Sequence, residues 1–471
     1  MRSNYLQQSN TLPIDPRFLN TQHPNQKNNL KRRTLLKSSL GPALMSALGS
    51  DRVLQLAGAQ PLGELTLNGA SQKNLKAAHV VIVGAGFGGT TAAKYLRLLS
   101  NQQINVTLIE PDPYFVSCPL SNLVITGSKS MSDITLSYKA LQQNYGIQVI
   151  KDRVASIDPL KRKLVTLQNL ELHYDYLVIS PGVELMYDEI MGLKNALNQQ
   201  QVLQAWGSTA ESVLLKQQLE AMNNGEIFAL SVPELPYRCP PGPYERASLV
   251  ANYFKKFKPK SKVIILDANQ DVTSKGALFK RFWAENYPHH LEYRPEHKVM
   301  EVDGANRTIK FEIQDDLKAA VLNVLPPMRA GAIAVQTGLA NVNKRWCEVD
   351  FLSFESSIAP WIHVLGDSIQ AGPYMPKSAH MANAHAKVAA AAIVAKLCDF
   401  APNPRPWLTN TCYSFVDPTQ AIYIASVHQY DPKEHTFKIL ANAGGVSGAP
   451  SEKEGEYALG WAKNIWADCL A

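Results

Sequence analysis

The sequence lacks the features that would place it in several large functional classes. It contains no stretch of about 20 uninterrupted apolar residues, so no membrane span is expected. It has no C-x-x-C-H motif, so the chain is not expected to carry a covalent haem itself. No metal-ligand spacing surrounds His380 or His385, which we assign to a helix surface or to the core, and no metal site is predicted.

The main body of the chain also lacks a surplus of basic residues. The formal charge is +7, but residues 1–59 hold eight Lys/Arg and two Asp/Glu, so six of these positive charges lie there. The charge therefore gives no reason to expect a nucleic-acid partner. With 471 residues, of which 45% are hydrophobic and 18% charged, the composition is that of a globular protein of two or three domains.

Residues 1–59 have the pattern of an export signal. Arg32 and Arg33 form a pair ahead of an apolar, small-residue stretch, and Ala57-Gly58-Ala59 fits the small-x-small cleavage pattern. This arrangement resembles a twin-arginine signal, and it predicts a periplasmic protein in an oxidising compartment where disulfides persist. A disordered basic tail is the alternative, and a cut after Ala47-Leu48-Gly49 is a second possible processing site.

A dinucleotide-binding pattern begins at residue 79. The apolar run 79–83 is typical of a buried parallel strand, and Gly84, Gly86 and Gly89 follow it at G-x-G-x-x-G spacing. A helix follows the glycines, and a second strand ends in Glu110. The glycines allow a tight turn and let backbone N–H groups approach a pyrophosphate, while Glu110 falls where a ribose hydroxyl is usually bound.

The other half of this framework lies far downstream. Residues 174–182 read as a strand and turn, and the strand 361–367 ends in Gly366-Asp367. Lys377 then precedes a long Ala-rich helix. This order resembles the flavin-dependent disulfide reductase superfamily. The resemblance implies that Asp367 hydrogen-bonds the ribityl and phosphate region of the cofactor, with Lys377 and the following helix N-terminus near the flavin.

A second nucleotide-binding segment is expected in such relatives, but here its glycine loop is missing. The strand EIFALSV and the helix ERASLVANYF are present, and five prolines occupy the connection between them. Proline has no N–H, so this loop cannot offer the donors that a pyrophosphate needs. The next strand ends in Asp267, which matches the position of a ribose-binding acid. We expect a domain that kept its fold and lost its nucleotide, so that the reducing equivalents do not come from NADH.

The predicted fold class is therefore α/β, with two Rossmann-like domains of the flavin-dependent disulfide reductase type and a C-terminal α+β interface domain. Two strands and one short helix are expected after the Pro-rich junction near residue 402. The predicted segments are the export signal (1–59), the first part of the FAD-binding domain (77–190), the second Rossmann-like domain without a nucleotide loop (191–330), the second part of the FAD-binding domain (331–400) and the interface domain (401–471).

Six cysteines are present, and the sequence alone leaves their pairing open, including six buried thiols. Cys118 lies in YFVSCPLSN, Cys239 in YRCPPGPYERAS and Cys412 in LTNTCYS, and KSAHMANAHAKVAAAA spans 377–392. These four motifs, in this order, are similar to those of the flavoprotein subunit of flavocytochrome c sulfide dehydrogenase. The resemblance runs from about residue 77 to the C-terminus.

The resemblance implies roles for the three cysteines. Cys118 would carry FAD through a thioether at the flavin 8α-methyl group. Cys239 and Cys412 would form a redox-active disulfide over the flavin ring, although they are 173 positions apart in the sequence. A purely structural bridge is the alternative for this pair. The three other cysteines are treated as structural or unpaired: Cys347, Cys398 and Cys469.

The chemistry expected from this resemblance is sulfide oxidation. Hydrosulfide would attack the disulfide by thiol–disulfide exchange, giving a persulfide and a thiolate. Glu245 is a candidate acid/base for the protons, or a helix N-terminal carboxylate favoured by the dipole, and it can be both. The electrons would pass to a c-type cytochrome subunit in a heterodimer, because this chain has no haem motif of its own.

Two other functions are alternatives at this point. A sulfide:quinone oxidoreductase is the nearest alternative enzyme, but one short C-terminal helix with interspersed Glu and Lys is a poor match to the amphipathic helices that such enzymes place on a membrane. A flavin-stabilised binding protein without turnover is the alternative outside enzymes. The presence of Cys118, Cys239 and Cys412 together argues against it.

Overall fold

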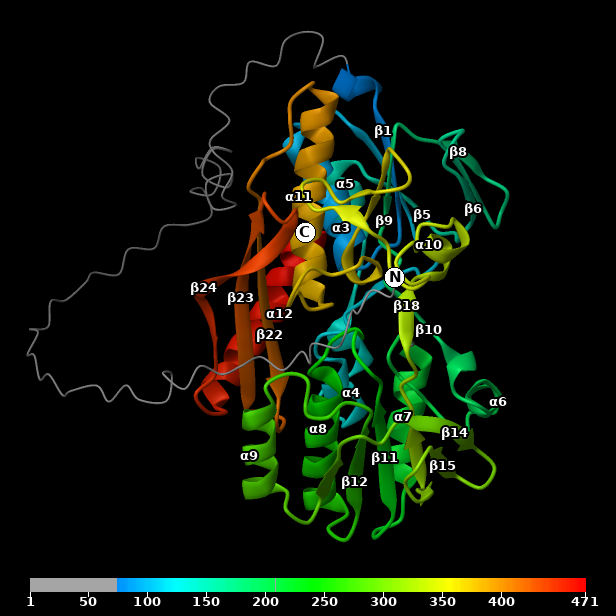
Figure 1. The fold of residues 1–471 in the computed structure, drawn as a ribbon, viewed down its shortest axis with the longest axis vertical. Coiled ribbons are helices and arrows are strands. Elements are labelled where there is room, and N and C mark those ends of the chain that lie inside the picture. The colour runs from blue at the N-terminus through cyan, green and yellow to red at the C-terminus, as the bar shows by residue number, and fades with distance from the viewer. Residues whose placement is uncertain (1–73, 208) are drawn as a thin grey trace, which may run out of the picture. The chain divides into compact units, whose positions relative to one another are not determined.

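The computed structural model describes residues 74–207 and 209–471. The export signal predicted in residues 1–59 lies outside these residues. The described part contains two mainly parallel sheets flanked by helices, one antiparallel sheet near the C-terminus and four small antiparallel sheets (Figure 1).

The large sheet is built from two distant parts of the chain. Its seven strands have the order β19-β20-β21-β9-β1-β2-β5, and the pairs from β21 to β5 are parallel. The bounds of the strands are β1 (His79–Val83), β2 (Asn105–Ile109), β5 (Gln148–Ile150), β9 (Tyr176–Ile179), β19 (Val349–Asp350), β20 (Glu355–Ser356) and β21 (Ile362–Val364).

The register of this sheet brings the ends of four strands to one edge. Val83 of β1 pairs with Ile109 of β2 and with Ile179 of β9, and Val364 of β21 pairs with the same Ile179. Because these strands are parallel, the residues that follow them meet at the carboxyl edge, where α/β proteins bind their ligands. The glycine turn, Glu110 and the Gly366-Asp367 pair therefore lie along one line.

Two helices pack against each other beside this edge. They are α3 (Phe87–Leu99) and α11 (Ala379–Leu397) (Figure 1). The buried face of α11 is rich in alanine, which lets the two helix backbones approach closely. The N-termini of both helices thus sit at the carboxyl edge of the sheet.

The second parallel sheet has four strands in the order β13-β12-β11-β17. They are flanked by α7 (Thr209–Ala221), α8 (Gly242–Phe257) and α9 (Gly276–Asn286). This is a smaller Rossmann-like unit, as predicted. Its strands are β11 (Ile227–Val232), β12 (Lys262–Asp267), β13 (Leu291–Arg294) and β17 (Val321–Asn323).

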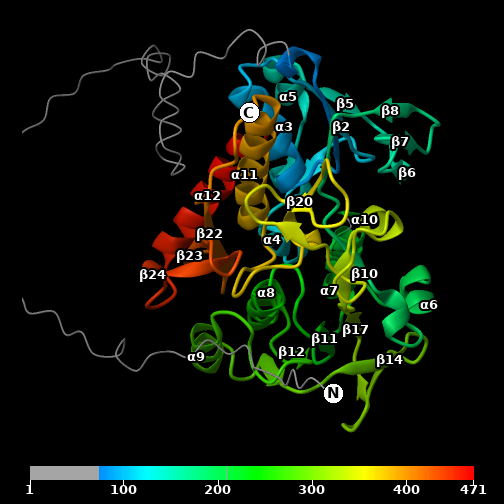
Figure 2. The same cartoon turned by 45° about the horizontal axis from the view of Figure 1, so that its top comes forward.

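The third sheet is antiparallel and contains one strand more than the two predicted. Its strands are β22 (Trp407–Phe415), β23 (Ala421–Asp431) and β24 (Thr436–Val446), and α12 (Glu452–Leu470) packs on it and against α3. The unpredicted strand is β22, which runs beside α11 and reaches α8 (Figures 1 and 2). The helix α12 has 19 residues and is longer than expected.

The remaining elements are short and connect these units. Two small antiparallel sheets each have three strands, and two further pairs complete the set. Their bounds are β3 (Phe115–Val116), β4 (Thr135–Leu136), β6 (Val154–Asp158), β7 (Lys163–Thr166), β8 (Glu171–His173), β10 (Val183–Leu185), β14 (Val299–Asp303), β15 (Thr308–Phe311), β16 (Leu317–Lys318), β18 (Met328–Ala330), α4 (Ser121–Ile125), α5 (Lys139–Tyr145), α6 (Leu193–Asn198) and α10 (Ala332–Gln336).

The predicted fold class is confirmed: two Rossmann-like α/β units and a C-terminal α+β segment are present. The predicted segment boundaries stay predictions. One hydrophobic cluster extends through buried residues of all three sheets, among them Val81, Leu230 and Leu408. The sheets therefore share a continuous core, and this core fixes the loops that carry the candidate site.

Candidate active site

The glycine turn after β1 has the geometry of a dinucleotide-binding loop. Gly84 has a φ of +93°, in the left-handed region that favours glycine, and its N–H donates to the carbonyl of Ile109 at 2.9 Å. A Cβ atom at Gly89 would lie 1.8 Å from the Gly84 carbonyl oxygen. Gly86 is the N-cap of α3 and offers no side-chain hydrogen bond to it, and a Cβ there would meet nothing within 4 Å. The start of α3 is thus open to a ligand, with free backbone donors.

Glu110 stands beside this turn at the end of β2. Its carboxylate accepts a hydrogen bond from the Ala85 N–H at 2.7 Å and another from the Asp112 N–H at 3.1 Å. Burial raises the pKa of the Glu110 carboxyl, and these two donors oppose the rise. The carboxylate is thereby fixed next to the turn, with further lone pairs free to accept from a hydroxyl.

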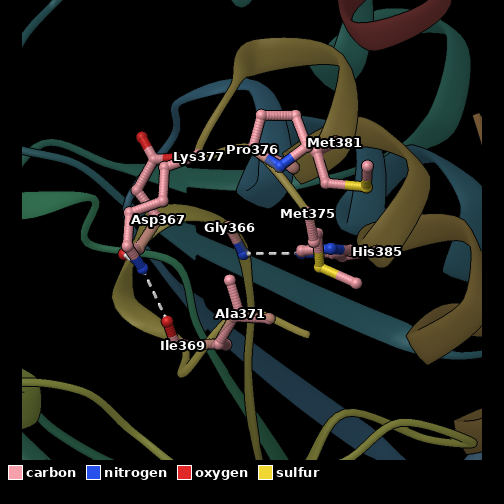
Figure 3. A pocket seen from close by; sticks show the side chains of 10 residues that line it. Gly366, Asp367, Ile369, Ala371, Met375, Pro376, Lys377, Met381 and His385 are labelled. Atoms are coloured by element: carbon pink, nitrogen blue, oxygen red, sulfur yellow. Dashed lines mark hydrogen bonds between the residues drawn. The ribbon is translucent and has the colours of Figure 1, made fainter. Parts of the chain in front are cut away.

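Gly366 and Asp367 line a small, narrow pocket (Figure 3). Lys377 lies at one side of it and donates from Nζ to the carbonyls of Asp367, at 2.9 Å, and Ile369, at 2.7 Å. The Lys377 ammonium also lies 3.6 Å from the centre of the Trp346 ring. Burial lowers the pKa of Lys377 to about 7. Lys377 therefore holds the loop that carries Asp367.

The Asp367 carboxylate is the one polar group in this loop that needs a partner. Its Oδ1 atom is buried and has no hydrogen-bond partner in residues 74–207 and 209–471. Burial raises the pKa of this carboxyl, and the positive charges of Arg238 and Lys377 oppose the rise. A buried acceptor without a donor is costly, so a hydroxyl or phosphate-bound group is expected to supply one.

These residues fit FAD. Gly84, Gly86 and the start of α3 would hold the pyrophosphate, and Glu110 would hold the adenosine ribose. Asp367 would accept from the ribityl and phosphate region, which answers its unpartnered oxygen.

Cys118 lies between β3 and α4, and its side chain is exposed. Its carbonyl accepts from the N–H of Ser121 at 3.1 Å and from the Ser121 hydroxyl at 2.7 Å, which fixes the turn. The neighbouring Ser117 hydroxyl accepts from the indole N–H of Trp466 at 2.9 Å, so α12 also supports this segment. Desolvation by the surrounding protein raises the pKa of the Cys118 thiol, and the positive charge of Arg238 opposes the rise.

Cys239 occupies the Pro-rich loop immediately before α8. It has a φ of +58°, a left-handed conformation that is uncommon for any residue with a side chain. Its N–H donates to the Lys377 carbonyl at 2.8 Å, and its carbonyl accepts from the Gly242 N–H at 2.8 Å. A Cβ at Gly242 would lie 3.0 Å from the Cys239 sulfur, so this sulfur packs on the first residue of α8. The helix dipole there favours a negative sulfur.

Cys412 lies on β22, the strand that the sequence did not predict. The preceding residue, Thr411, donates its N–H to Nδ1 of His380 at 2.9 Å, which ties β22 to the start of α11. The Cys412 carbonyl accepts from Nζ of Lys275 at 3.0 Å. Burial raises the pKa of the Cys412 thiol, and the Lys275 charge opposes the rise. His380 thus has a structural role, as a half-buried acceptor at a helix start.

Glu245 connects the segments of all three cysteines. Its Oε2 accepts from the Asn122 side-chain amide at 2.8 Å, four residues after Cys118, and its Oε1 accepts from the Phe415 N–H at 2.8 Å, three residues after Cys412. Glu245 itself lies in the first turn of α8, behind Cys239. Burial raises the pKa of this carboxyl, while its two donors and the charges of Lys275 and Arg246 oppose the rise.

The three thiols influence one another. After burial, the strongest influences that raise the pKa of the Cys239 thiol are the charges of Cys412 and then Cys118. All six cysteines of the chain are present as free thiols, so the pairing of Cys239 with Cys412 stays a prediction. The other three are buried, and Cys469 accepts or donates a hydrogen bond with Thr91 at 3.2 Å.

In the second Rossmann-like unit, Asp267 stands where an acidic residue would bind a nucleotide ribose, but its carboxylate is already occupied by protein donors. The Asp267 carboxylate accepts from the Tyr244 hydroxyl at 2.7 Å, from the Tyr293 hydroxyl at 3.0 Å and from Asn269 at 2.8 and 2.9 Å. The side chain is fully buried. Protein donors thus use the oxygens that a ribose would need, and the prolines remove the donors that a pyrophosphate would need.

We therefore expect NADH to leave the flavin oxidised. Under anaerobic conditions, NADH in large excess should cause no loss of the visible flavin absorbance, because neither its pyrophosphate nor its ribose finds donors or acceptors in this unit. Dithionite in the same cell is the control that the flavin can be reduced. Rapid bleaching by micromolar NADH would contradict the prediction.

Sequence reasoning missed four side chains at this site. Asn122 also accepts at Oδ1 from Nε of the buried Arg246, at 3.0 Å, and it lies in the PLSN motif that follows Cys118. His385 accepts from the Gly366 N–H at 3.3 Å and lines the pocket of Asp367. Arg238 has a buried Nε without a partner in the part of the chain that the structure describes. Lys275 is a single basic residue in a loop, and nothing in the local sequence indicates its contact with β22.

Within residues 74–207 and 209–471, no group of three or more His, Cys, Asp or Glu side chains could hold a metal ion. No helix in the same part of the chain combines the length and the apolar character that crossing a membrane requires.

Comparison with known families gives matches along most of the described chain. Residues 78–221 match the pyridine nucleotide-disulphide oxidoreductases. Residues 212–326 match the central part of the sulfide dehydrogenase [flavocytochrome c] flavoprotein chain, and residues 404–470 match the flavin-binding part of flavocytochrome c sulphide dehydrogenase.

Individual relatives agree with these matches. The sulfide dehydrogenase [flavocytochrome c] flavoprotein chain of Chlorobaculum thiosulfatiphilum is 60% identical over 45 residues, which are 10% of this chain and 92% of that sequence. The mitochondrial sulfide:quinone oxidoreductase of Mus musculus is 26% identical over 332 residues, 66% of this chain and 70% of the relative. The structure of the sulfide:quinone oxidoreductase from Aquifex aeolicus matches with a TM-score of 0.70 at 19% identity, covering 83% of this chain and 92% of the other.

The fold and the cofactor edge define an FAD-dependent oxidoreductase with two Rossmann-like units. Within this class, the chain belongs to the family of the flavoprotein chains of flavocytochrome c sulfide dehydrogenase. It is a flavoprotein of sulfide oxidation.

Proposed function

We propose that this chain is the flavoprotein subunit of a periplasmic sulfide dehydrogenase. It would oxidise hydrosulfide with a Cys239–Cys412 disulfide, hold FAD covalently on Cys118 and pass the electrons to a c-type cytochrome subunit. The observation that carries the proposal is the position of Glu245, whose carboxylate is bonded to the segments of Cys118 and Cys412 from the helix behind Cys239.

The sulfur chemistry begins with exchange at the disulfide. Hydrosulfide attacks one sulfur, a new S–S bond forms, and the Cys239–Cys412 bond breaks. The products are one persulfide and one cysteine thiolate, and no electron has yet left the sulfur atoms. The dipole of α8 at Cys239 and the Lys275 ammonium at Cys412 both favour the negative charge that this step creates.

Glu245 is placed to handle the proton of hydrogen sulfide. Burial raises the pKa of its carboxyl, which makes the ionised carboxylate a better proton acceptor. Its hydrogen bonds from Asn122 and Phe415 hold the carboxylate in one orientation. In this role it is a base for the incoming substrate, and its place in the first turn of α8 keeps it stable when ionised.

Bound FAD would supply the acceptor for two electrons from the sulfur atoms and the means to release them singly. In the proposed arrangement, Cys118 tethers it through the 8α position, the carboxyl edge of the large sheet holds its phosphates and adenosine, and Asp367 and Lys377 order the loop beside it. A haem on the partner subunit accepts single electrons, as the family name of a flavocytochrome c indicates.

A quinone is the second candidate acceptor. The similarity to sulfide:quinone oxidoreductases extends over much more of the chain than the match of 45 residues to the sulfide dehydrogenase. The cytochrome is favoured because residues 404–470, which follow the flavin framework, match the flavin-binding part of the flavocytochrome family.

Stopped-flow reduction by sulfide distinguishes the two acceptors. The full protein, reduced by sulfide under anaerobic conditions, is mixed with oxidised c-type cytochrome or with a soluble quinone as the only acceptor. We expect rapid reoxidation of the flavin by cytochrome and slow reoxidation by quinone. Brisk quinone reduction without cytochrome reduction would assign the chain to the quinone enzymes, and a flavin that sulfide cannot reduce would reject sulfide oxidation.

The periplasmic location rests on the export signal predicted in residues 1–59. An oxidising compartment also suits a resting disulfide. Mass spectrometry of the mature protein is expected to find its first residue at Gln60, and a mature chain that starts at Met1 would remove this part of the proposal.

A further inference from the structure

A buried lysine reaches the strand of Cys412 from a different unit. Lys275 precedes α9 and is only 8% exposed. Its Nζ donates to the carbonyl of Cys412 at 3.0 Å and to the hydroxyl oxygen of Ser414 at 2.8 Å. The second Rossmann-like unit, which has lost its nucleotide contacts, thus sends a charged group into the candidate site.

The electrostatic surroundings of Lys275 are dominated by this site. Burial lowers the pKa of its ammonium, and the charges that oppose this come first from Cys412, then from Glu245, Cys239 and Glu454. In residues 74–207 and 209–471, Lys275 forms no ion pair with a carboxylate, unlike Lys262 and Lys280 of the same unit. Cys412 and Ser414 are two residues apart on β22, so their side chains leave the strand on the same face, and Nζ contacts that face at the Ser414 hydroxyl.

We propose that Lys275 is a positioning residue that holds a positive charge beside the Cys412 sulfur and favours its negatively charged form. The negatively charged form is either a thiolate on Cys412 or a persulfide anion bound to it. The reaction that uses this charge is the one under the proposed function, but the charge itself is a property of the reduced protein and can be measured without sulfide.

The charge, rather than the hydrogen bonds alone, explains a lysine at this place. The carbonyl of Cys412 and the hydroxyl of Ser414 are neutral acceptors, which a neutral donor would satisfy. Burying an ammonium is costly unless a negative group compensates it. On β22 the groups able to become negative are Cys412 and Tyr413, and Cys412 is the one that leads the charges acting on Lys275. Glu245 on α8 is the second, and it acts on Cys412 in the opposite direction.

The test measures the ionisation of the Cys412 thiol by alkylation. The holoprotein is reduced with dithiothreitol, freed of reductant under anaerobic conditions and treated with iodoacetamide across a pH series, and the Cys412 peptide is followed by mass spectrometry. Only the thiolate reacts, so the rate reports the pKa of the thiol. In Lys275→Met the midpoint is expected to rise by about one pH unit or more, with alkylation at neutral pH about tenfold slower.

Three further variants separate charge from structure. Lys275→Arg retains the charge and should keep the midpoint of the wild-type protein. Glu245→Gln removes a negative neighbour and should move the midpoint the other way, to lower pH. Lys280 lies on α9, the helix that follows Lys275, in an exposed ion pair with Asp271, and Lys280→Met should leave the midpoint unchanged.

An unchanged midpoint in Lys275→Met, with normal flavin content, would overturn the proposal. A Lys275→Arg variant with the raised midpoint of Lys275→Met would overturn it as well, because a retained positive charge would then have no effect on the Cys412 thiol. Failure of sulfide to reduce the flavin would reject the proposed function and leave this measurement intact, so the two failures are distinguishable.

Discussion

Replacement of Cys118 by serine is expected to free the flavin from the polypeptide. After acid precipitation of Cys118→Ser, the yellow colour should be in the supernatant, whereas the wild-type pellet should keep it. The physical reason is that serine cannot form the thioether, while the glycine turn, Glu110 and Asp367 still bind FAD without a covalent bond. Mass spectrometry of the denatured chain should show the mass of one FAD in the wild-type protein and none in the variant.

Cys398→Ser is the matched control for this experiment. Cys398 is a buried thiol just after α11, at the end of this helix opposite to the one that lies beside the candidate site. It should keep its flavin in the pellet. The assignment of Cys118 is wrong if Cys118→Ser retains flavin through the same treatment, or if the wild-type protein releases it.

The cofactor framework was largely predictable from sequence because it is local. The strand, glycines and helix from residue 79 onward are neighbours in the chain, and the acid at 110 follows one strand later. Parallel pairing then dictates that these residues meet at one edge, and the register of Val83 with Ile109 agrees with it. Similarly, the loss of the second glycine loop was visible from its prolines. The saturation of Asp267 by two tyrosines was not, because Tyr293 lies on a different strand.

The cysteine site depends on contacts that no local pattern carries. TNTCYS has an alternation that is weak for a strand, so β22 was missed, although it brings Cys412 to the start of α8. Glu245 was predictable because it follows Cys239 closely in the sequence. Its hydrogen bonds with Asn122 and Phe415 were not, because they join segments more than 100 residues apart. Lys275 had no signal at all, because its partner strand comes 137 positions later.

Replacement of either Cys239 or Cys412 by serine is expected to abolish flavin reduction by sulfide. The rate of bleaching in stopped-flow mixing should fall by at least about a thousandfold, the scale on which removal of a nucleophile usually acts. Covalent flavin should remain in both variants, because Cys118 is untouched. Dithionite should still reduce the flavin, which shows that the loss lies in the sulfur chemistry.

Peptide mapping of the wild-type protein without reductant checks the resting state. A linked peptide pair containing Cys239 and Cys412 is expected, and it should disappear after reduction. The Cys398→Ser control should behave like the wild-type protein in both assays. Normal bleaching by sulfide in a Cys239→Ser/Cys412→Ser double variant would reject the disulfide mechanism.

Both cysteines are needed because exchange at a disulfide uses its two sulfurs differently. One sulfur accepts the incoming sulfur atom, and the other leaves with the electron pair of the broken bond. A serine at either position leaves no bond to attack, so hydrosulfide has no way to give up its electrons at this site. The surroundings suit this division: the helix start of α8 lies against Cys239, and the Lys275 ammonium lies at Cys412. Each single variant removes one half of the pair and should therefore fail as completely as the double variant.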